Sequence, residues 1–79
     1  MEIQLKYFGA IVEITKLNAE VWNFELEQIS IQELKEKLVA KYNLSKTAFS
    51  IALNKKMAQP SDLIHSKDEL AILPPFAGG

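Results

Sequence analysis

The stretch Ser30-Ile-Gln-Glu-Leu-Lys-Glu-Lys-Leu-Val-Ala-Lys-Tyr-Asn43 predicts one amphipathic helix. Its start has the form of a capping box, in which the Ser30 hydroxyl and the Glu33 carboxylate each accept a hydrogen bond from a free backbone N–H group. Asn43 is suited to end the helix. Apolar residues recur at steps of three and four and form one stripe, made of Ile31, Leu34, Leu38 and Tyr42. A helix of this kind requires an apolar surface to cover.

The residues before this helix predict two strands joined through a short helix. Residues 2–8 alternate, with one apolar face made of Ile3, Leu5 and Tyr7, but Phe8 falls on the polar face. Residues 21–27 alternate again and place on one face Trp22, Phe24 and Leu26. We expect these two strands to pair. Between them, residues 9–17 predict a short helix followed by a turn near Asn18, with helical spacing of Ile11, Ile14 and Leu17.

The residues after the main helix predict three more strands. Phe49, Ile51 and Leu53 alternate, residues 54–56 form a turn, and residues 57–58 form a short return strand. Two turn-rich loops at residues 59–62 and 66–69 precede a last strand at residues 70–73. The order strand, strand, helix, strand, strand, strand predicts an α+β fold. A mixed sheet of four to five strands is covered on one face by one main helix.

Composition limits the classes of function. The chain has 79 residues, which corresponds to a single domain spanning residues 1–79. A net charge of −1 with interspersed signs offers no basic stripe for nucleic acid. The chain has no cysteine, which removes disulfides, thiolate nucleophiles and iron–sulfur ligation. The start is charged and alternating, unlike a signal peptide, and no apolar run approaches the roughly 20 residues of a membrane span. We expect a cytoplasmic protein that binds no membrane.

Side chains suited to conventional catalysis are few. His65 is the only histidine, and its immediate neighbour Ser66 cannot meet it in the geometry of a catalytic triad. The carboxylates of Asp62, Asp68 and Glu69 match no metal-binding loop and are better explained as solvated turn residues. No glycine-rich phosphate loop is present. The sequence therefore predicts no metal site and no cofactor bound by the chain, and the folded body is not expected to be an enzyme.

The last six residues, Pro74-Pro75-Phe76-Ala77-Gly78-Gly79, differ from the rest. A terminal Gly-Gly pair taken alone is most often a frayed end. Here it follows a double proline, which favours the extended polyproline conformation directly after a strand. We expect residues 74–79 to form an extended flexible tail that holds the glycines away from the body. Without side chains, Gly78 and Gly79 can pass through a narrow channel in a partner and present the Gly79 carboxyl group.

These features together resemble the small subunit of molybdopterin synthase, a sulfur carrier of the ubiquitin-like β-grasp superfamily. The resemblance covers the whole chain and includes the opening Leu5-Lys6-Tyr7-Phe8-Gly9-Ala10, the capped helix and the ending Leu70-Ala-Ile-Leu-Pro-Pro-Phe-Ala-Gly-Gly79. It implies that Gly79 is adenylated by an activating enzyme that uses ATP and Mg, and is then converted to a thiocarboxylate by a sulfur donor.

The resemblance also implies a partner and a docking surface. Sulfur would pass to a pterin precursor in the large subunit, which carries the catalytic side chains of a heterotetramer of two small and two large subunits. The chain itself would be a non-catalytic, sulfur-donating subunit. Phe8 and Leu73 both fall on the strand faces opposite the core, so they predict an outward apolar patch unless a loop covers it. The implied partner-binding residues are Phe8, Leu73, Pro74, Pro75, Phe76, Ala77 and Gly78.

Three other functions remain open. A thiamine-pathway sulfur carrier shares the fold and chemistry, although its tail usually lacks the double proline of Pro74-Pro75. A ubiquitin-like modifier would join Gly79 to lysines of target proteins after the same activation. A non-covalent β-grasp binding module would carry an incidental tail.

Overall fold

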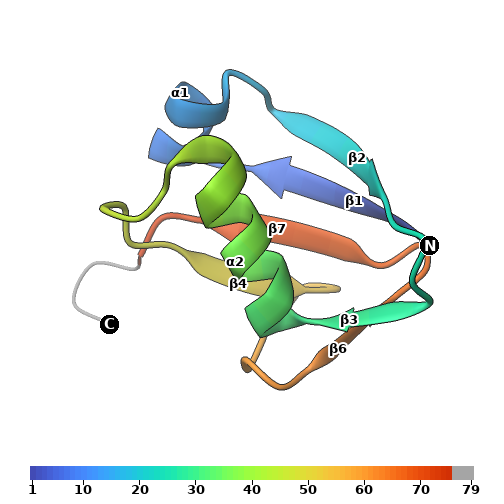
Figure 1. Cartoon of the computed structure of the whole chain (residues 1–79). Coiled ribbons are helices and arrows are strands. Elements are labelled where there is room, and N and C mark those ends of the chain that lie inside the picture. The colour runs from blue at the N-terminus through green and yellow to red at the C-terminus, as the bar shows by residue number, and fades with distance from the viewer. Residues whose placement is uncertain (76–79) are drawn as a thin grey trace.

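The computed structural model describes residues 1–75, in which the longer of two helices lies across one face of the main sheet (Figure 1). The elements follow in the order β1 (Glu2–Tyr7), α1 (Ala10–Thr15), β2 (Ala19–Asn23), β3 (Gln28–Ser30), α2 (Ile31–Tyr42), β4 (Ser50–Leu53), β5 (Lys56–Met57), β6 (Leu63–His65) and β7 (Glu69–Leu73). The predicted mixed sheet under one main helix is confirmed, since α2 covers a five-stranded sheet.

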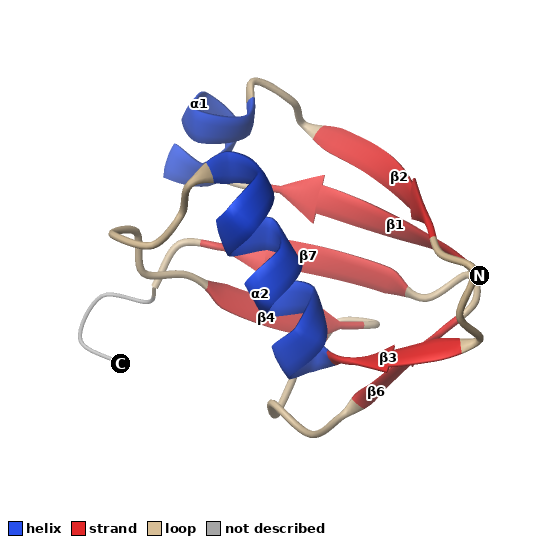
Figure 2. Ribbon diagram, in the orientation of Figure 1, coloured by secondary structure: helices blue, strands red, loops and turns tan. Residues whose placement is uncertain are grey.

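The last strand of the chain lies in the middle of the main sheet. The strand order is β2-β1-β7-β4-β5. Strand β7 runs parallel to β1 on one side and antiparallel to β4 on the other, whereas β1 and β2 form the predicted antiparallel pair. Parallel neighbours need a long connection, and the chain between β1 and β7 includes α2 (Figure 2).

The core lies between the sheet and α2. Alternation along β1 buries every second side chain, and the same rule holds along β7. The fully buried leucines and isoleucines contribute about 1.5–3 kcal/mol each, and they include Ile3, Leu5, Leu34, Leu38, Leu70 and Ile72. The predicted helical stripe is confirmed, with Tyr42 half-buried at its end.

Both predicted ends of α2 are confirmed. Ser30 Oγ accepts a hydrogen bond from the Glu33 N–H at 3.1 Å, and Glu33 Oε1 accepts one from the Ser30 N–H at 3.2 Å. Asn43 is left-handed, with φ 56° and ψ 49°, and its N–H donates to the carbonyl of Val39. These contacts satisfy backbone groups that the helix leaves unpaired.

A second, two-stranded sheet was not predicted from the sequence. Strands β3 and β6 pair antiparallel, with Ile29 opposite Ile64, and both of these side chains are buried. Each strand has three residues, too few for alternation to be recognised. Strand β6 fills residues 63–65, for which no element was predicted between the two expected loops at residues 59–62 and 66–69.

The predicted strand at residues 21–27 is wrong at both ends. Strand β2 starts two residues earlier and ends at Asn23. Trp22 and Phe24 pack partly against the core as expected, but Leu26 is 54% exposed because the chain bends after Phe24. Alternation alone cannot show where the pairing of two strands stops.

The short helix and the second half of the sheet differ from expectation in detail. In α1, Ile11 is buried, but Ile14 and Leu17 are exposed, and Thr15 takes the inward position four residues after Ile11. Strand β4 begins at Ser50 rather than at residue 49, and β5 covers Lys56–Met57 rather than residues 57–58.

Candidate functional site

Strands β1 and β7 are parallel neighbours, so their C-terminal ends lie at the same end of the sheet. The Phe8 N–H donates to the carbonyl of Ile72 at 3.1 Å, which continues the pairing beyond the end of β1. Lys6 lies opposite Ala71 in the register, so two residues further on Phe8 lies beside Leu73. The fold therefore brings together the two side chains that were predicted to share a surface.

Phe8 and Leu73 lie on the sheet face opposite α2. Phe8 is 44% exposed and Leu73 is half-buried. Small or flexible apolar side chains continue this face across the sheet, where Ala71 is opposite Ala52 and Ala52 is opposite Met57. The outward orientation agrees with expectation for both residues, and their contact with a partner stays a prediction.

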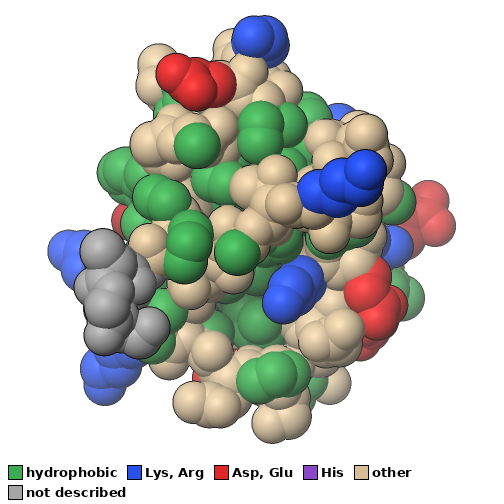
Figure 3. Space-filling model, turned by 90° about the vertical axis from the view of Figure 1, so that its left-hand side faces the viewer, with side chains coloured by type: hydrophobic (Ala, Val, Ile, Leu, Met, Phe, Trp, Pro, Cys, Tyr) green, Lys and Arg blue, Asp and Glu red, His purple; other side chains and the backbone are tan. Residues whose placement is uncertain are grey.

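The end of the sheet where β1 and β7 stop is rich in apolar side chains. Figure 3 faces this end and shows hydrophobic side chains over much of it. An open hollow of about 450 Å³ lies next to Phe8 and is lined by Lys6, Tyr7, Phe8, Gly9, Val12, Asn18 and Ala19. One ion pair, between Lys6 and Glu69 at 3.4 Å, borders this region on the outer face. An apolar surface with a charged border is typical of a protein-binding site.

Gly9 was not predicted to belong to this site. It has φ 56° and ψ −134°, a conformation that side chains disfavour. A Cβ atom on Gly9 would lie 3.0 Å from Cγ of Pro74. The turn after β1 therefore packs closely against the first proline of the tail and sets where the chain leaves the sheet. A glycine directly after an alternating strand was the available sequence signal.

The structure places the beginning of the predicted tail. Pro74 is half-buried against Gly9, and Pro75 is exposed. The predictions for Phe76, Ala77, Gly78 and Gly79 lie outside the described residues. Of the predicted site residues, Phe8, Leu73 and Pro74 are therefore brought to one end of the sheet.

A polar cluster around Glu20 lies on the sheet face that α2 covers, between β2 and α2. Tyr7 and Tyr42 both donate hydrogen bonds to Glu20 Oε2, and Lys41 Nζ lies 3.6 Å from Glu20 Oε1. The two tyrosine rings meet edge to face, with their centroids 6.1 Å apart. The Trp22 indole N–H is buried and makes no hydrogen bond of ordinary geometry within residues 1–75.

This cluster has perturbed pKa values with clear causes. Burial raises the pKa of Tyr7 far above its usual range, and the Glu20 carboxylate raises it further. Burial and the same carboxylate raise the pKa of Tyr42. Burial opposes ionisation of Glu20, but its pKa is lowered because hydrogen bonds from Tyr42 and Tyr7, the nearby Trp22 N–H and the Lys41 charge together outweigh burial.

The protonation states of this cluster favour a structural role. At neutral pH both tyrosines stay protonated and donate to an ionised carboxylate, so none of the three is prepared to accept a proton. The cluster was not found from the sequence because its members lie on three elements, and Tyr7 had been assigned only to the core.

Asp62 and Asp68 stabilise local turns as expected, whereas Glu69 is the first residue of β7 and pairs with Lys6, so its assignment to a turn is wrong. Asp68 Oδ2 accepts from the His65 N–H at 2.8 Å, and Asp62 Oδ2 accepts from the Gln59 N–H at 2.8 Å. Over residues 1–75, no three histidine, cysteine or acidic side chains gather as a metal site would require. Neither helix in this part of the chain has the length and apolar character needed to cross a membrane.

Several solved structures share the fold of this chain. Molybdopterin converting factor subunit 1 from Pyrococcus furiosus has a TM-score of 0.85 at 14% identity, covering 95% of this chain and 98% of that one. Small archaeal modifier protein 1 from Haloferax volcanii has a TM-score of 0.79 at 19% identity, with 100% of both chains covered.

A third similar structure is a complex. It contains subunits 1 and 2 of the molybdopterin-converting factor from Helicobacter pylori, and the match has a TM-score of 0.69 at 24% identity over 100% of both chains. These likenesses establish the ubiquitin-like β-grasp fold. In sequence, residues 5–79 match the ThiS family, which covers nearly the whole chain. The chain therefore belongs to the ThiS family of ubiquitin-like sulfur-carrier proteins.

Proposed function

We propose that this chain is the small subunit of molybdopterin synthase and carries sulfur as a thiocarboxylate on Gly79. The observation that supports this most is the course of β7. The central strand of a ThiS-family domain leads through Pro74-Pro75, at an apolar end of the sheet, toward the Gly78-Gly79 sequence. In this proposal the folded domain binds the partner protein, and sulfur is carried on the terminal carboxyl group.

The chemistry begins with an unreactive group. A terminal carboxylate has a pKa of about 3.5 and is ionised at neutral pH, so its carbon is a poor electrophile. An activating enzyme with ATP and Mg²⁺ joins a carboxylate oxygen to the α-phosphate and releases pyrophosphate. Hydrosulfide, or a donor equivalent to it, then attacks the carbonyl carbon. A C–S bond forms, the C–O bond to AMP breaks, and the thiocarboxylate remains.

The sulfur is then delivered inside another protein. The outer face around Phe8 and Leu73 docks on the large subunit, while residues 74–79 enter its active site. There the thiocarboxylate sulfur bonds to a carbon of the pterin precursor in place of an oxygen substituent, and water then cleaves the acyl C–S bond and restores the Gly79 carboxylate. The Helicobacter pylori complex of subunits 1 and 2 supports a large-subunit partner for this fold. Neither Tyr7 nor Glu20 is needed as acid or base, because the large subunit supplies the catalytic side chains.

A second function is favoured by the structures named small archaeal modifier protein 1, from Haloferax volcanii and Methanosarcina acetivorans. In that role the adenylated Gly79 is joined to a lysine amine of a target protein. Activation is identical, so only the acceptor differs. The thiamine-pathway carrier is the third acceptor to test, and the double proline Pro74-Pro75 argues against it.

Reconstitution separates these roles. The thiocarboxylated chain, prepared with labelled sulfide, is mixed with the large subunit and the pterin precursor, and the label is followed by mass spectrometry. We expect label in the pterin product and regeneration of the unlabelled chain. Parallel reactions supply a thiazole precursor, or target proteins with the activating enzyme and ATP. Label delivered only to the thiazole precursor, or Gly79 recovered only in isopeptide linkage to lysine, would replace the molybdopterin role by one of the other two.

A further inference from the structure

Strand β2 is an edge of the main sheet, and one side of its backbone has no partner strand among residues 1–75. Along its other side, the Tyr7 N–H donates to the Asn18 carbonyl and the Phe24 N–H donates to the Met1 carbonyl, both at 2.8 Å. Hydrogen-bonded pairs alternate in an antiparallel ladder, so the pairs with β1 use the backbone of Glu20 and Trp22. The N–H and carbonyl groups of Ala19, Val21 and Asn23 therefore point away from the sheet.

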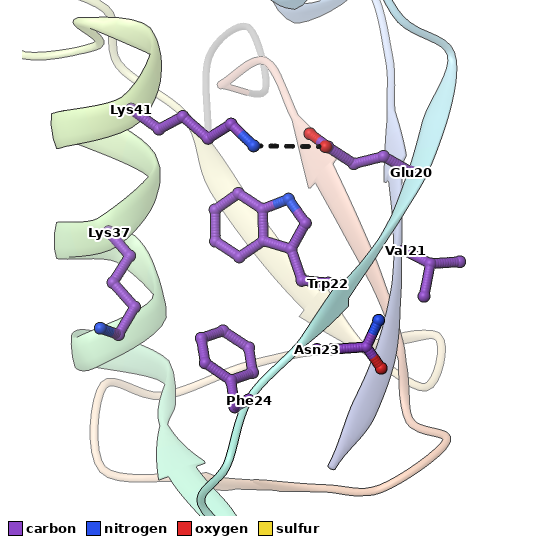
Figure 4. Close-up of a pocket in the computed structure, with 7 residues that line it drawn as sticks. All are labelled: Glu20, Val21, Trp22, Asn23, Phe24, Lys37 and Lys41. Carbon is purple, nitrogen blue, oxygen red and sulfur yellow. Dashed lines mark ion pairs between the residues drawn. The ribbon is translucent and has the colours of Figure 1, made fainter.

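A groove of about 400 Å³ runs along this edge, between β2 and α2. Its lining residues are drawn in Figure 4 and comprise Glu20, Val21, Trp22, Asn23, Phe24, Lys37 and Lys41. Trp22 on β2 and Phe24 just after this strand point toward the helix and meet edge to face, with their ring centroids 6.1 Å apart. The floor of the groove is therefore aromatic. Val21 points to the opposite side of β2 and is 51% exposed.

The helix side of the groove is positively charged. Lys37 lies over the Phe24 ring with Nζ 5.8 Å from its centroid, and Lys41 lies over the Trp22 ring at 5.1 Å. Lys41 pairs with Glu20, but Lys37 makes no ion pair with any residue from 1 to 75. Three charged side chains line the groove, two positive and one negative. The groove therefore carries a positive charge that its own residues leave uncompensated.

We propose that this edge binds an extended acidic peptide segment of a partner protein, which adds a strand antiparallel or parallel to β2. The exposed backbone groups of Val21 supply main-chain hydrogen bonds to the added strand. Branched aliphatic side chains of the segment contact Trp22 and Phe24 on one face and Val21 on the other. Flanking carboxylates pair with Lys37 and, in part, with Lys41.

This site is separate from the end of the sheet that carries the tail. Strand β1 lies between β2 and β7, and Phe8 and Leu73 do not line the groove. A partner bound at the β2 edge can hold the domain while the C-terminal residues are engaged elsewhere. This site does not require the sulfur chemistry, because it is formed by an open strand edge, an aromatic floor and a lysine that makes no ion pair with residues 1–75.

The test uses the full chain and a synthetic peptide. The peptide has three central valine or isoleucine residues, two glutamates on each side and blocked ends. Trp22 is the only tryptophan, so its fluorescence reports on the groove directly. We expect saturable binding, with protection of the Val21 amide from hydrogen exchange. A peptide with lysines in place of the glutamates is expected not to bind.

Two variants test the contacts separately. Lys37→Glu is expected to weaken binding about tenfold, whereas Lys35→Glu is the matched control on the same helix and is expected to change it less than about twofold. Lys35 lies over Phe49 and lines a different hollow. Val21→Pro removes the outward N–H without removing a ladder donor, and is expected to weaken binding about tenfold relative to Val21→Ala.

Three results would overturn this inference. The first is equal binding of the acidic and basic peptides. The second is equal loss in the Lys37 and Lys35 variants, with both still folded by circular dichroism. The third is a Trp22 signal that changes with protein concentration alone, together with a dimer in sedimentation that Val21→Pro abolishes. That result would assign the edge to a second copy of this chain.

Discussion

The two faces of the main sheet differ sharply, and the difference separates the residues that make the fold from those that we assign to function. The inner face is closed by α2, and Leu70 and Ile72 are fully buried there. The outer face of the same strand carries Ala71 and half-buried Leu73, beside exposed Phe8. Strand β7 therefore provides both core and surface from alternating positions, before it leads into the tail.

The largest effect on stability is expected on the inner face. Leu70→Ala should lower the free energy of unfolding by about 2–5 kcal/mol, because it leaves a cavity between the sheet and α2. Leu73→Ala, on the same strand with the same change in size, should cost clearly less. Urea unfolding of both variants measures the comparison. Equal losses would mean that Leu73 belongs to the core and that its side chain is not available to bind a partner.

The outer face is expected to matter for the partner rather than for folding. Phe8→Ala should leave the free energy of unfolding nearly unchanged but weaken binding to the large subunit by about 2 kcal/mol, the usual cost of truncating an aromatic hot spot. Calorimetric titration with the large subunit measures this. Leu63→Ala, an exposed apolar residue on the separate two-stranded sheet, is the control. Loss of stability without loss of affinity in Phe8→Ala would remove Phe8 from the docking surface.

Substitutions at the junction between the folded domain and the tail are expected to lower the stability of the domain. Gly9→Ala should destabilise the domain by about 1–2 kcal/mol, because a side chain is disfavoured at φ 56° and its Cβ would crowd Pro74. Combining it with Pro74→Ala separates the two causes in a double-mutant cycle. If the double variant recovers part of the loss, the contact with Pro74 contributes. A wholly additive result would leave backbone strain as the only cause.

The smallest effect is expected from the polar cluster, and it depends on pH. The pKa of Glu20 is lowered in the folded state, so its stabilisation is present above the unfolded-state pKa of about 4.5 and is lost as pH falls through the lower folded pKa. Glu20→Gln should cost about 1 kcal/mol near pH 7. The difference from wild type should shrink in acid. Urea unfolding between pH 3 and pH 7 checks this, and a constant difference would contradict it.

The sequence predicted elements whose signals are local. The capping box at Ser30 and Glu33 fixes the start of α2, and alternation identifies β1 and β7. Even the outward position of Phe8 follows from alternation. These features could be predicted because each depends on residues a few positions apart.

Features that depend on distant residues could not be predicted. The pairing of β3 with β6 joins two short segments more than thirty positions apart, and neither has a pattern of its own. The contact of Gly9 with Pro74 and the hydrogen bonds from Tyr7 and Tyr42 to Glu20 likewise arise only when the strands are in register. The open edge of β2 could not be recognised because strand order is not visible in the sequence.

The most direct measurement is the intact mass of the chain after incubation with an activating enzyme, ATP, Mg²⁺ and sulfide. We expect a mass gain equal to replacement of one oxygen by one sulfur, located at Gly79 by fragmentation. Deleting Gly79 should abolish this gain and leave urea unfolding unchanged. An unmodified wild-type chain under conditions that modify a known sulfur carrier would contradict the account. Equal modification of the deleted chain would contradict it as well.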